Sequence, residues 1–119
     1  MSEPAPSLAS KRCIPCRPGM LPLDAAAVAG LLPQLDGWAV ERDGTFQLHH
    51  LAKRFKFKNF ADGLAFANRV GVLADAEEHH PDVLIRWGEV TITVYTHAID
   101  GLTESDFVLS AKIDAIPRS

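Results

Sequence analysis

Three histidines stand where side chains from separate elements could converge on one site. His79 and His80 are adjacent and precede Pro81, where a helical pattern gives way to a strand pattern, and His97 ends the last strand pattern. Histidine can donate or accept a proton near neutral pH because its reference pKa is about 6.5. The three residues are therefore candidates for general acid–base catalysis. The alternatives are a structural role or a zinc site, although no HExxH-like spacing occurs.

The order of residues around the histidine pair limits how the three rings can meet. Adjacent side chains on an extended backbone point to opposite sides, so we expect only one of His79 and His80 to share a face with His97. Pro81 restricts His80 to extended or turn conformations and could change this arrangement by forcing a turn. Pro81 therefore shapes the loop that carries both rings.

Other side chains with chemical potential have structural explanations. Asp106 stands at the third helical position after Thr103, which is typical of a capping box. Trp87 and Tyr95 have residue types that are typical of sheet packing. No GxSxG, GxGxxG or P-loop motif occurs, which disfavours serine hydrolases, dinucleotide-binding enzymes and phosphoryl transfer.

Cys13 and Cys16 form a CxxC pair near the N-terminus. Such a pair could ligate zinc, cycle as a redox pair or have no chemical role. A structural zinc site requires four ligands, and no second CxxC occurs in the chain. We favour the interpretation that the pair has no catalytic role and that the protein binds no metal.

Length and composition indicate one compact domain. The chain has 119 residues, of which 47% are hydrophobic and 23% are charged, and its formal net charge is −3. An acidic chain of this kind has no electrostatic footprint for nucleic acid. No secretory signal pattern occurs, and no apolar run approaches the roughly 18 residues of a membrane span. We therefore expect a cytoplasmic protein with neither nucleic acid nor membrane as its partner.

The first half of the chain predicts an arm, a short helix and a hairpin. Residues 1–22 are rich in proline and lack a hydrophobic period, so we interpret them as a flexible arm, followed by a domain over residues 23–119. Asp24 can cap a first helix that Pro33 ends or distorts. Asp43-Gly44 favours a tight hairpin turn, and a change of apolar parity predicts a bulge near His49-His50.

The second half predicts the main helix, a second hairpin and a last helix. Asn59 can cap a helix that extends to about Glu77. Two strands, 83–87 and 89–96, are joined through Gly88, and Thr103 caps the final helix. The order α-β-β-α-β-β-α favours an α+β fold, in which a four-stranded antiparallel sheet has helices packed on one face.

The pattern of these residues resembles the signature of the pterin-4a-carbinolamine dehydratases. The resemblance covers about residues 23–116 and is supported by the segment 55–60 before the main helix and by Gly101-Leu102-Thr103 before the last one. The signature residues, in order, are Asp75, His79-His80-Pro81, Trp87, His97 and Asp106.

The resemblance implies a site and a role for each matching residue. His79, His80 and His97 match the active-site histidines of the family, and Asp75, Trp87 and Asp106 match supporting positions. Asp75 stands where many members have glutamate, which has a longer reach, and Ala98 stands where some have a polar residue. The positions implied to bind the pterin are Glu78, His79, His80, Tyr95, Thr96, His97 and Ala98.

The resemblance also implies a function. The family dehydrates 4a-hydroxytetrahydropterin to quinonoid dihydropterin in tetrahydrobiopterin recycling, a hydro-lyase reaction without a cofactor, and its members form homodimers or homotetramers. An aromatic amino acid hydroxylase would be the enzyme served. The alternatives are a non-catalytic partner-binding or transcriptional coactivator module, and a dehydratase for a molybdopterin-type pterin.

Overall fold

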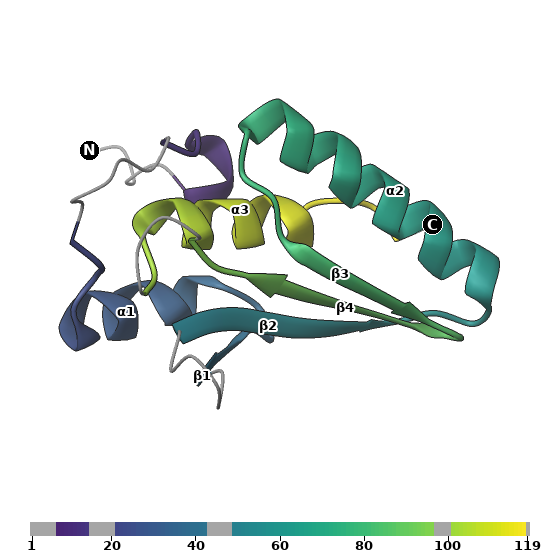
Figure 1. Ribbon diagram of the computed structural model, residues 1–119, viewed down its shortest axis with the longest axis horizontal. Coiled ribbons are helices and arrows are strands. Elements are labelled where there is room, and N and C mark those ends of the chain that lie inside the picture. The colour runs from purple at the N-terminus through teal and green to yellow at the C-terminus, as the bar shows by residue number, and fades with distance from the viewer. Residues whose placement is uncertain (1–6, 15–20, 43–48, 97–100, 119) are drawn as a thin grey trace, which may run out of the picture.

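The protein is a four-stranded antiparallel sheet with helices on one face, as the sequence predicts (Figure 1). The computed structural model describes residues 7–14, 21–42, 49–96 and 101–118. The sheet order is β1-β2-β4-β3, so β1 and β3 form its edges. The elements are η1 (Leu8–Ser10), α1 (Ala25–Leu31), η2 (Leu32–Gln34), β1 (Ala39–Arg42), β2 (His49–Lys56), α2 (Phe60–Glu77), β3 (Asp82–Arg86), β4 (Glu89–Val94) and α3 (Glu104–Asp114), where η denotes a short 3-10 helix.

The helix starts follow the predicted capping residues. The Asp24 side chain accepts a hydrogen bond from the Ala27 N–H at 2.8 Å, and the Asn59 side chain accepts one from the Asp62 N–H at 2.8 Å. Each bond satisfies a backbone donor that has no partner within its helix. Pro33 lies inside η2, where α1 gives way to a tighter 3-10 turn. Capping side chains therefore define where α1 and α2 begin.

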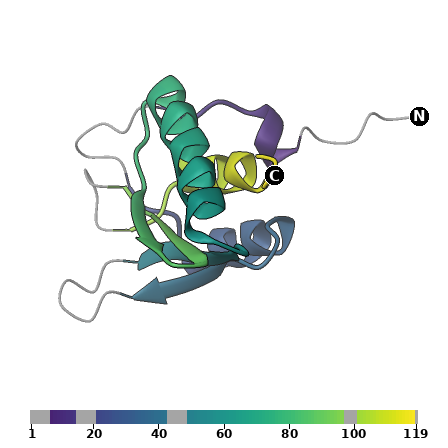
Figure 2. The ribbon, with the colours of Figure 1, turned by 90° about the vertical axis from the view of Figure 1, so that its right-hand side faces the viewer.

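The core lies between the sheet and the helices α2 and α3 (Figure 2). Alternate residues of each strand point toward the helices, because side chains along a strand alternate between its two faces. The fully buried residues of this layer come from β2, β4, α2 and α3. They include Leu51, Phe55, Val90, Ile92, Val94, Phe66, Val70, Phe107, Leu109 and Ile113.

The register of β2 corrects one expectation from the sequence. Pairing is uninterrupted from His49 to Ala52 against β1 and from Leu51 to Lys56 against β4, so the described strand has no bulge near His49-His50. Lys53 occupies the inward position between Leu51 and Phe55, and its ammonium group lies 2.7 Å from Asp114 Oδ1 on α3. Because Lys53 is paired, it can occupy an inward position, and the strand keeps its alternation of inward and outward side chains without an inserted residue. The predicted turn at residues 43–44 lies outside the described residues.

Part of the N-terminal arm packs on α3. The Leu8 side chain is buried, and the Lys11 ammonium group lies 2.6 Å from Glu104 Oε1. The Ser105 hydroxyl accepts a hydrogen bond from the Ile14 N–H at 2.7 Å. With the sheet, α2 and this segment around it, α3 is covered on most sides. The division of the chain into an arm and a domain stays a prediction.

Replacing Leu8 by alanine should destabilise the protein by about 2–4 kcal/mol, because a buried leucine side chain leaves a cavity when it is truncated. Leu21→Ala is the matched control, since Leu21 is 87% exposed whereas Leu8 is 4% exposed. Urea denaturation of both variants would measure the two free energies of unfolding. Equal, small effects would contradict the docking of residues 7–14 on α3.

Candidate active site

A left-handed turn ends α2 directly before His79 and His80. Glu78, the residue that ends α2, has φ 53°, and the His79 N–H donates to the Ala74 carbonyl at 3.2 Å. This arrangement is a Schellman motif, in which glycine usually occupies the left-handed position. A glutamate there is strained, and backbone strain of this kind is typical of functional sites. The turn therefore ends α2 directly before the two histidines.

The His79 ring is held by a buried carboxylate on α3. His79 Nε2 lies 2.7 Å from Asp106 Oδ1, and the two side chains are 11% and 0% exposed. Asp106 Oδ2 accepts a hydrogen bond from the Thr103 N–H at 2.8 Å and another from the Thr96 hydroxyl at 2.8 Å. One carboxyl group therefore caps α3, anchors the end of β4 and orients His79.

These contacts define which nitrogen of His79 can exchange a proton with a substrate. A carboxylate oxygen accepts hydrogen bonds, so we assign the shared proton to Nε2, which donates to Asp106. The other ring nitrogen, Nδ1, is then the acid–base atom of His79. A buried carboxylate on Nε2 also stabilises the imidazolium that forms when Nδ1 accepts a proton.

His80 lies in a different environment. Its Nε2 is 2.9 Å from Asp75 Oδ1 on α2, and both side chains are largely exposed to solvent. The two neighbouring rings thus contact carboxylates on different helices. His97 and Ala98 lie outside the described residues, so their positions relative to these rings stay predictions. An exposed pair of charges is screened by water and holds its members less firmly than a buried one.

The remaining candidates fall into two groups. Thr96 is buried with its hydroxyl on Asp106, and the Tyr95 hydroxyl donates to Asp82 Oδ2 at 3.2 Å, so both lie where β3 begins and β4 ends. Trp87 does not join them. It is 74% exposed at the turn between β3 and β4, at the far end of β3 from His80, and its supporting role stays a prediction.

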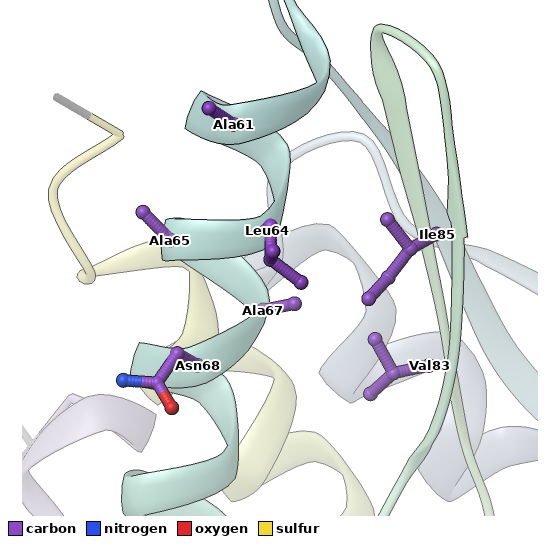
Figure 3. Close-up of a pocket in the computed structure, with 7 residues that line it drawn as sticks. All are labelled: Ala61, Leu64, Ala65, Ala67, Asn68, Val83 and Ile85. Atoms are coloured by element: carbon purple, nitrogen blue, oxygen red, sulfur yellow. The ribbon is translucent and has the colours of Figure 1, made fainter.

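An apolar groove between α2 and β3 opens beside His80. Figure 3 shows Leu64 and Ala67 of α2 facing Val83 and Ile85 of β3 across it. An adjoining hollow shares Ala67, Asn68 and Val83 with the groove and extends to Asp75, His80 and Pro81. The groove is therefore connected to the exposed histidine through this hollow.

The described residues contain no cluster of three or more metal-ligating side chains. In the same part of the chain, no helix combines the length and the apolar composition that a bilayer crossing requires. The predicted absence of a metal and of a membrane partner stays a prediction.

Sequence comparison identifies close relatives of the chain. Residues 21–116 match the family model described as pterin 4 alpha carbinolamine dehydratase. A protein of Rubrobacter xylanophilus, provisionally named pterin-4-alpha-carbinolamine dehydratase, is 50% identical over 109 residues, which span 92% of this chain and 97% of the relative. A protein of Alkaliphilus metalliredigens with the same provisional name is also 50% identical over 109 residues, spanning 91% and 94% of the two chains.

Two solved structures share the fold. A transcriptional coactivator/pterin dehydratase from Brucella melitensis superposes with a TM-score of 0.69 at 27% identity, covering 80% of this chain and 97% of that one. A pterin dehydratase-like protein described as a RuBisCO assembly factor in the alpha-carboxysome gives a TM-score of 0.56 at 25% identity, covering 67% and 88%.

Proposed function

Because the chain belongs to the pterin 4 alpha carbinolamine dehydratase family, we propose that it removes water from a 4a-hydroxytetrahydropterin and releases quinonoid dihydropterin. The observation that carries the proposal is the contact between His79 and the buried Asp106 carboxylate, because it prepares one ring nitrogen for proton transfer. We place this activity in the cytoplasm and in tetrahydrobiopterin recycling.

The reaction requires two proton transfers. One proton reaches the hydroxyl group on C4a, which departs as water, and another leaves N5 as the double bond between C4a and N5 forms. No oxidation state changes, so the chemistry requires neither a redox cofactor nor a metal. General acid–base groups of this kind contribute on the order of 10²- to 10⁴-fold to a rate.

We assign the two transfers to His79 and His97 and the orientation of the pterin mainly to His80. His79 has a buried partner that fixes its ring, whereas the His80–Asp75 pair is exposed and better suited to contact with a ligand. Glu78, Tyr95, Thr96 and Ala98 were expected beside the pterin from the family pattern. Of these, Glu78, Tyr95 and Ala98 keep the proposed role of lining the pterin site.

A coupled reaction tests the proposed function. An aromatic amino acid hydroxylase would generate the 4a-hydroxy pterin, and the appearance of quinonoid dihydropterin would be followed with and without the chain. We expect the chain to raise that rate at least about tenfold, as one positioned acid–base group can supply. An unchanged rate with folded protein would favour the partner-binding or molybdopterin-type alternative.

The partner-binding alternative rests on one observation, the exposed apolar groove between α2 and β3. The two solved neighbours are described as a coactivator/dehydratase and as an assembly factor, so the fold occurs in proteins with such roles. The Asp106 carboxylate would cap α3 in either kind of protein, but a pure binding module has no physical need for a histidine held on its second oxygen. That contact favours the enzyme.

We also propose that the chain forms a homo-oligomer through the edge strand β3. In the described part of the chain, no strand pairs with the outer side of β3, and Val83 and Leu84 are exposed. Antiparallel pairing of two copies about Leu84 would place Asp82 of each copy opposite Arg86 of the other. Opposite charges at such cross-strand positions are stabilising, and unpaired edges promote association.

A charge exchange on β3 tests this interface. Arg86→Asp would place two aspartates opposite each other at both ends, and we expect the dimer to weaken at least about tenfold because like charges destabilise cross-strand pairs. The double variant Asp82→Arg, Arg86→Asp restores opposite charges and should restore the dimer. Light scattering after size exclusion would measure both, and a monomeric wild type would overturn the interface.

A further inference from the structure

Thr96 has a contact that its expected role beside the pterin does not explain. It is the second residue after the end of β4 and directly precedes His97 in the sequence. Its side chain is buried, its hydroxyl lies 2.8 Å from Asp106 Oδ2, and its oxygen is 3.3 Å from the Thr103 hydroxyl. The hydroxyl therefore faces α3 and its carboxylate within the interior.

The two oxygens of Asp106 have different tasks. Oδ1 contacts His79 Nε2 at 2.7 Å, whereas Oδ2 accepts from the Thr103 N–H and from the Thr96 hydroxyl. The bond from Thr103 ties the carboxylate to its own helix only. The bond from Thr96 is the one that joins it to β4. The Thr103 hydroxyl adds a longer bond to Oδ2 at 3.4 Å. The rotation of the carboxylate, and hence the direction in which Oδ1 holds His79, depends on these donors.

We propose that Thr96 is a positioning residue that acts through Asp106. Its hydroxyl ties the segment after β4, one residue before His97 in the sequence, to the carboxylate that orients His79. This inference rests on the proposed dehydratase function and replaces the expected contact between the Thr96 side chain and the pterin.

The side-chain type at position 96 suits this role. Threonine combines a hydroxyl donor with a β-branched shape that packs at a strand end, and valine has almost the same shape without the donor. Thr96→Val therefore removes the hydroxyl and its contacts with Asp106 and Thr103 with little change in volume. Thr96→Ser keeps the donor and loses only a methyl group. Thr93→Val is the matched control, because Thr93 lies within β4 opposite Ala52 and Asp82, away from Asp106.

The charged groups around His79 are few in the described residues. Asp106 faces its ring from α3, Glu78 precedes it at the end of α2, and the next residue, His80, pairs with Asp75. Of these groups, Asp106 is the one in contact with the ring. A change in how Asp106 is held should therefore appear directly in the proton arrangement of His79.

The test combines steady-state kinetics with nitrogen-15 NMR of the His79 ring. We expect Thr96→Val to lower kcat roughly tenfold with KM within about twofold, the pattern of a lost transition-state interaction. The His79 spectrum should change from a single tautomer with the proton on Nε2 to a mixture. Thr96→Ser should restore both the rate and the spectrum, and Thr93→Val should alter neither.

Several outcomes would overturn the inference. A raised KM with unchanged kcat would make Thr96 a substrate contact, and wild-type kcat and tautomer in Thr96→Val would remove its role altogether. Thr96→Ala removes the same donor and replaces the valine variant if that variant does not fold. The NMR result needs no turnover, so an inactive wild type with an altered His79 tautomer in Thr96→Val would refute the dehydratase function and leave the positioning contact in place.

Discussion

Asp106→Asn is expected to lower kcat on the order of 10²- to 10⁴-fold, because an amide cannot fix the ring of an acid–base histidine as a carboxylate does. Asp106 is fully buried and lies 2.7 Å from His79 Nε2. An asparagine there can donate an N–H to His79 Nε2, which favours the tautomer with the ring proton on Nδ1. In that tautomer Nδ1 cannot accept a proton from the substrate. The variant would also lose the charge that stabilises the imidazolium.

The structure of α3 should survive this change. Asparagine can still accept the hydrogen bond from the Thr103 N–H, which is 2.8 Å from Asp106 Oδ2, so the capping contact is kept. Asp75→Asn is the matched control, because Asp75 contacts the exposed His80 and that pair is screened by solvent. Steady-state kinetics and thermal unfolding of both variants would separate catalysis from stability. Equal losses of kcat in the two variants would contradict the account.

His79→Ala should lower kcat on the order of 10²- to 10⁴-fold, as loss of a general acid–base group does. His97→Ala should have an effect of similar size if it supplies the second transfer. His80→Ala should mainly raise KM, because we assign that residue to orientation of the pterin. The three variants would be compared in one assay of carbinolamine dehydration.

His50→Ala is the control for this histidine series. His50 lies on β2 and pairs with Glu41 on β1 at 3.5 Å, and neither residue belongs to the proposed site. Its removal should leave kcat and KM unchanged. If His79→Ala, His80→Ala and His97→Ala all reduced kcat by the same factor, the division of labour among them would be wrong.

Local signals in the sequence predict much of the fold. Asn59 predicts the start of α2, Gly88 the turn between β3 and β4, and Thr103 the start of α3, and all three are confirmed. These features depend on residues within a few positions of each other, where capping and turn chemistry act. The order of helices and strands, and the fold class, follow from them.

Contacts between distant segments could not be predicted in this way. Lys53 occupies an inward position because Asp114 on α3 pairs with it, and the alternation of apolar residues alone suggested a bulge instead. Leu8 is buried because the segment around it packs on α3, although the composition of residues 1–22 suggested a flexible arm. Tertiary contacts determine whether such residues are buried, and these contacts produce no periodic pattern in the sequence.

Asp106 shows how the same limit applies to the site. The sequence predicts that Asp106 caps a helix, and from the sequence this role and a role in supporting catalysis are two alternatives. In the structure Oδ2 contacts the Thr103 N–H while Oδ1 contacts His79, so one carboxylate serves both purposes. The family signature includes this position, but it does not indicate the contact with Thr96, and the arrangement of His97 stays a prediction.

The most direct measurement is the decay of a 4a-hydroxytetrahydropterin, followed by ultraviolet absorbance, with wild-type protein and with His79→Ala. The account predicts that the wild type accelerates the decay and that the variant loses most of this acceleration while remaining folded. A folded wild type that leaves the decay at its uncatalysed rate would contradict it.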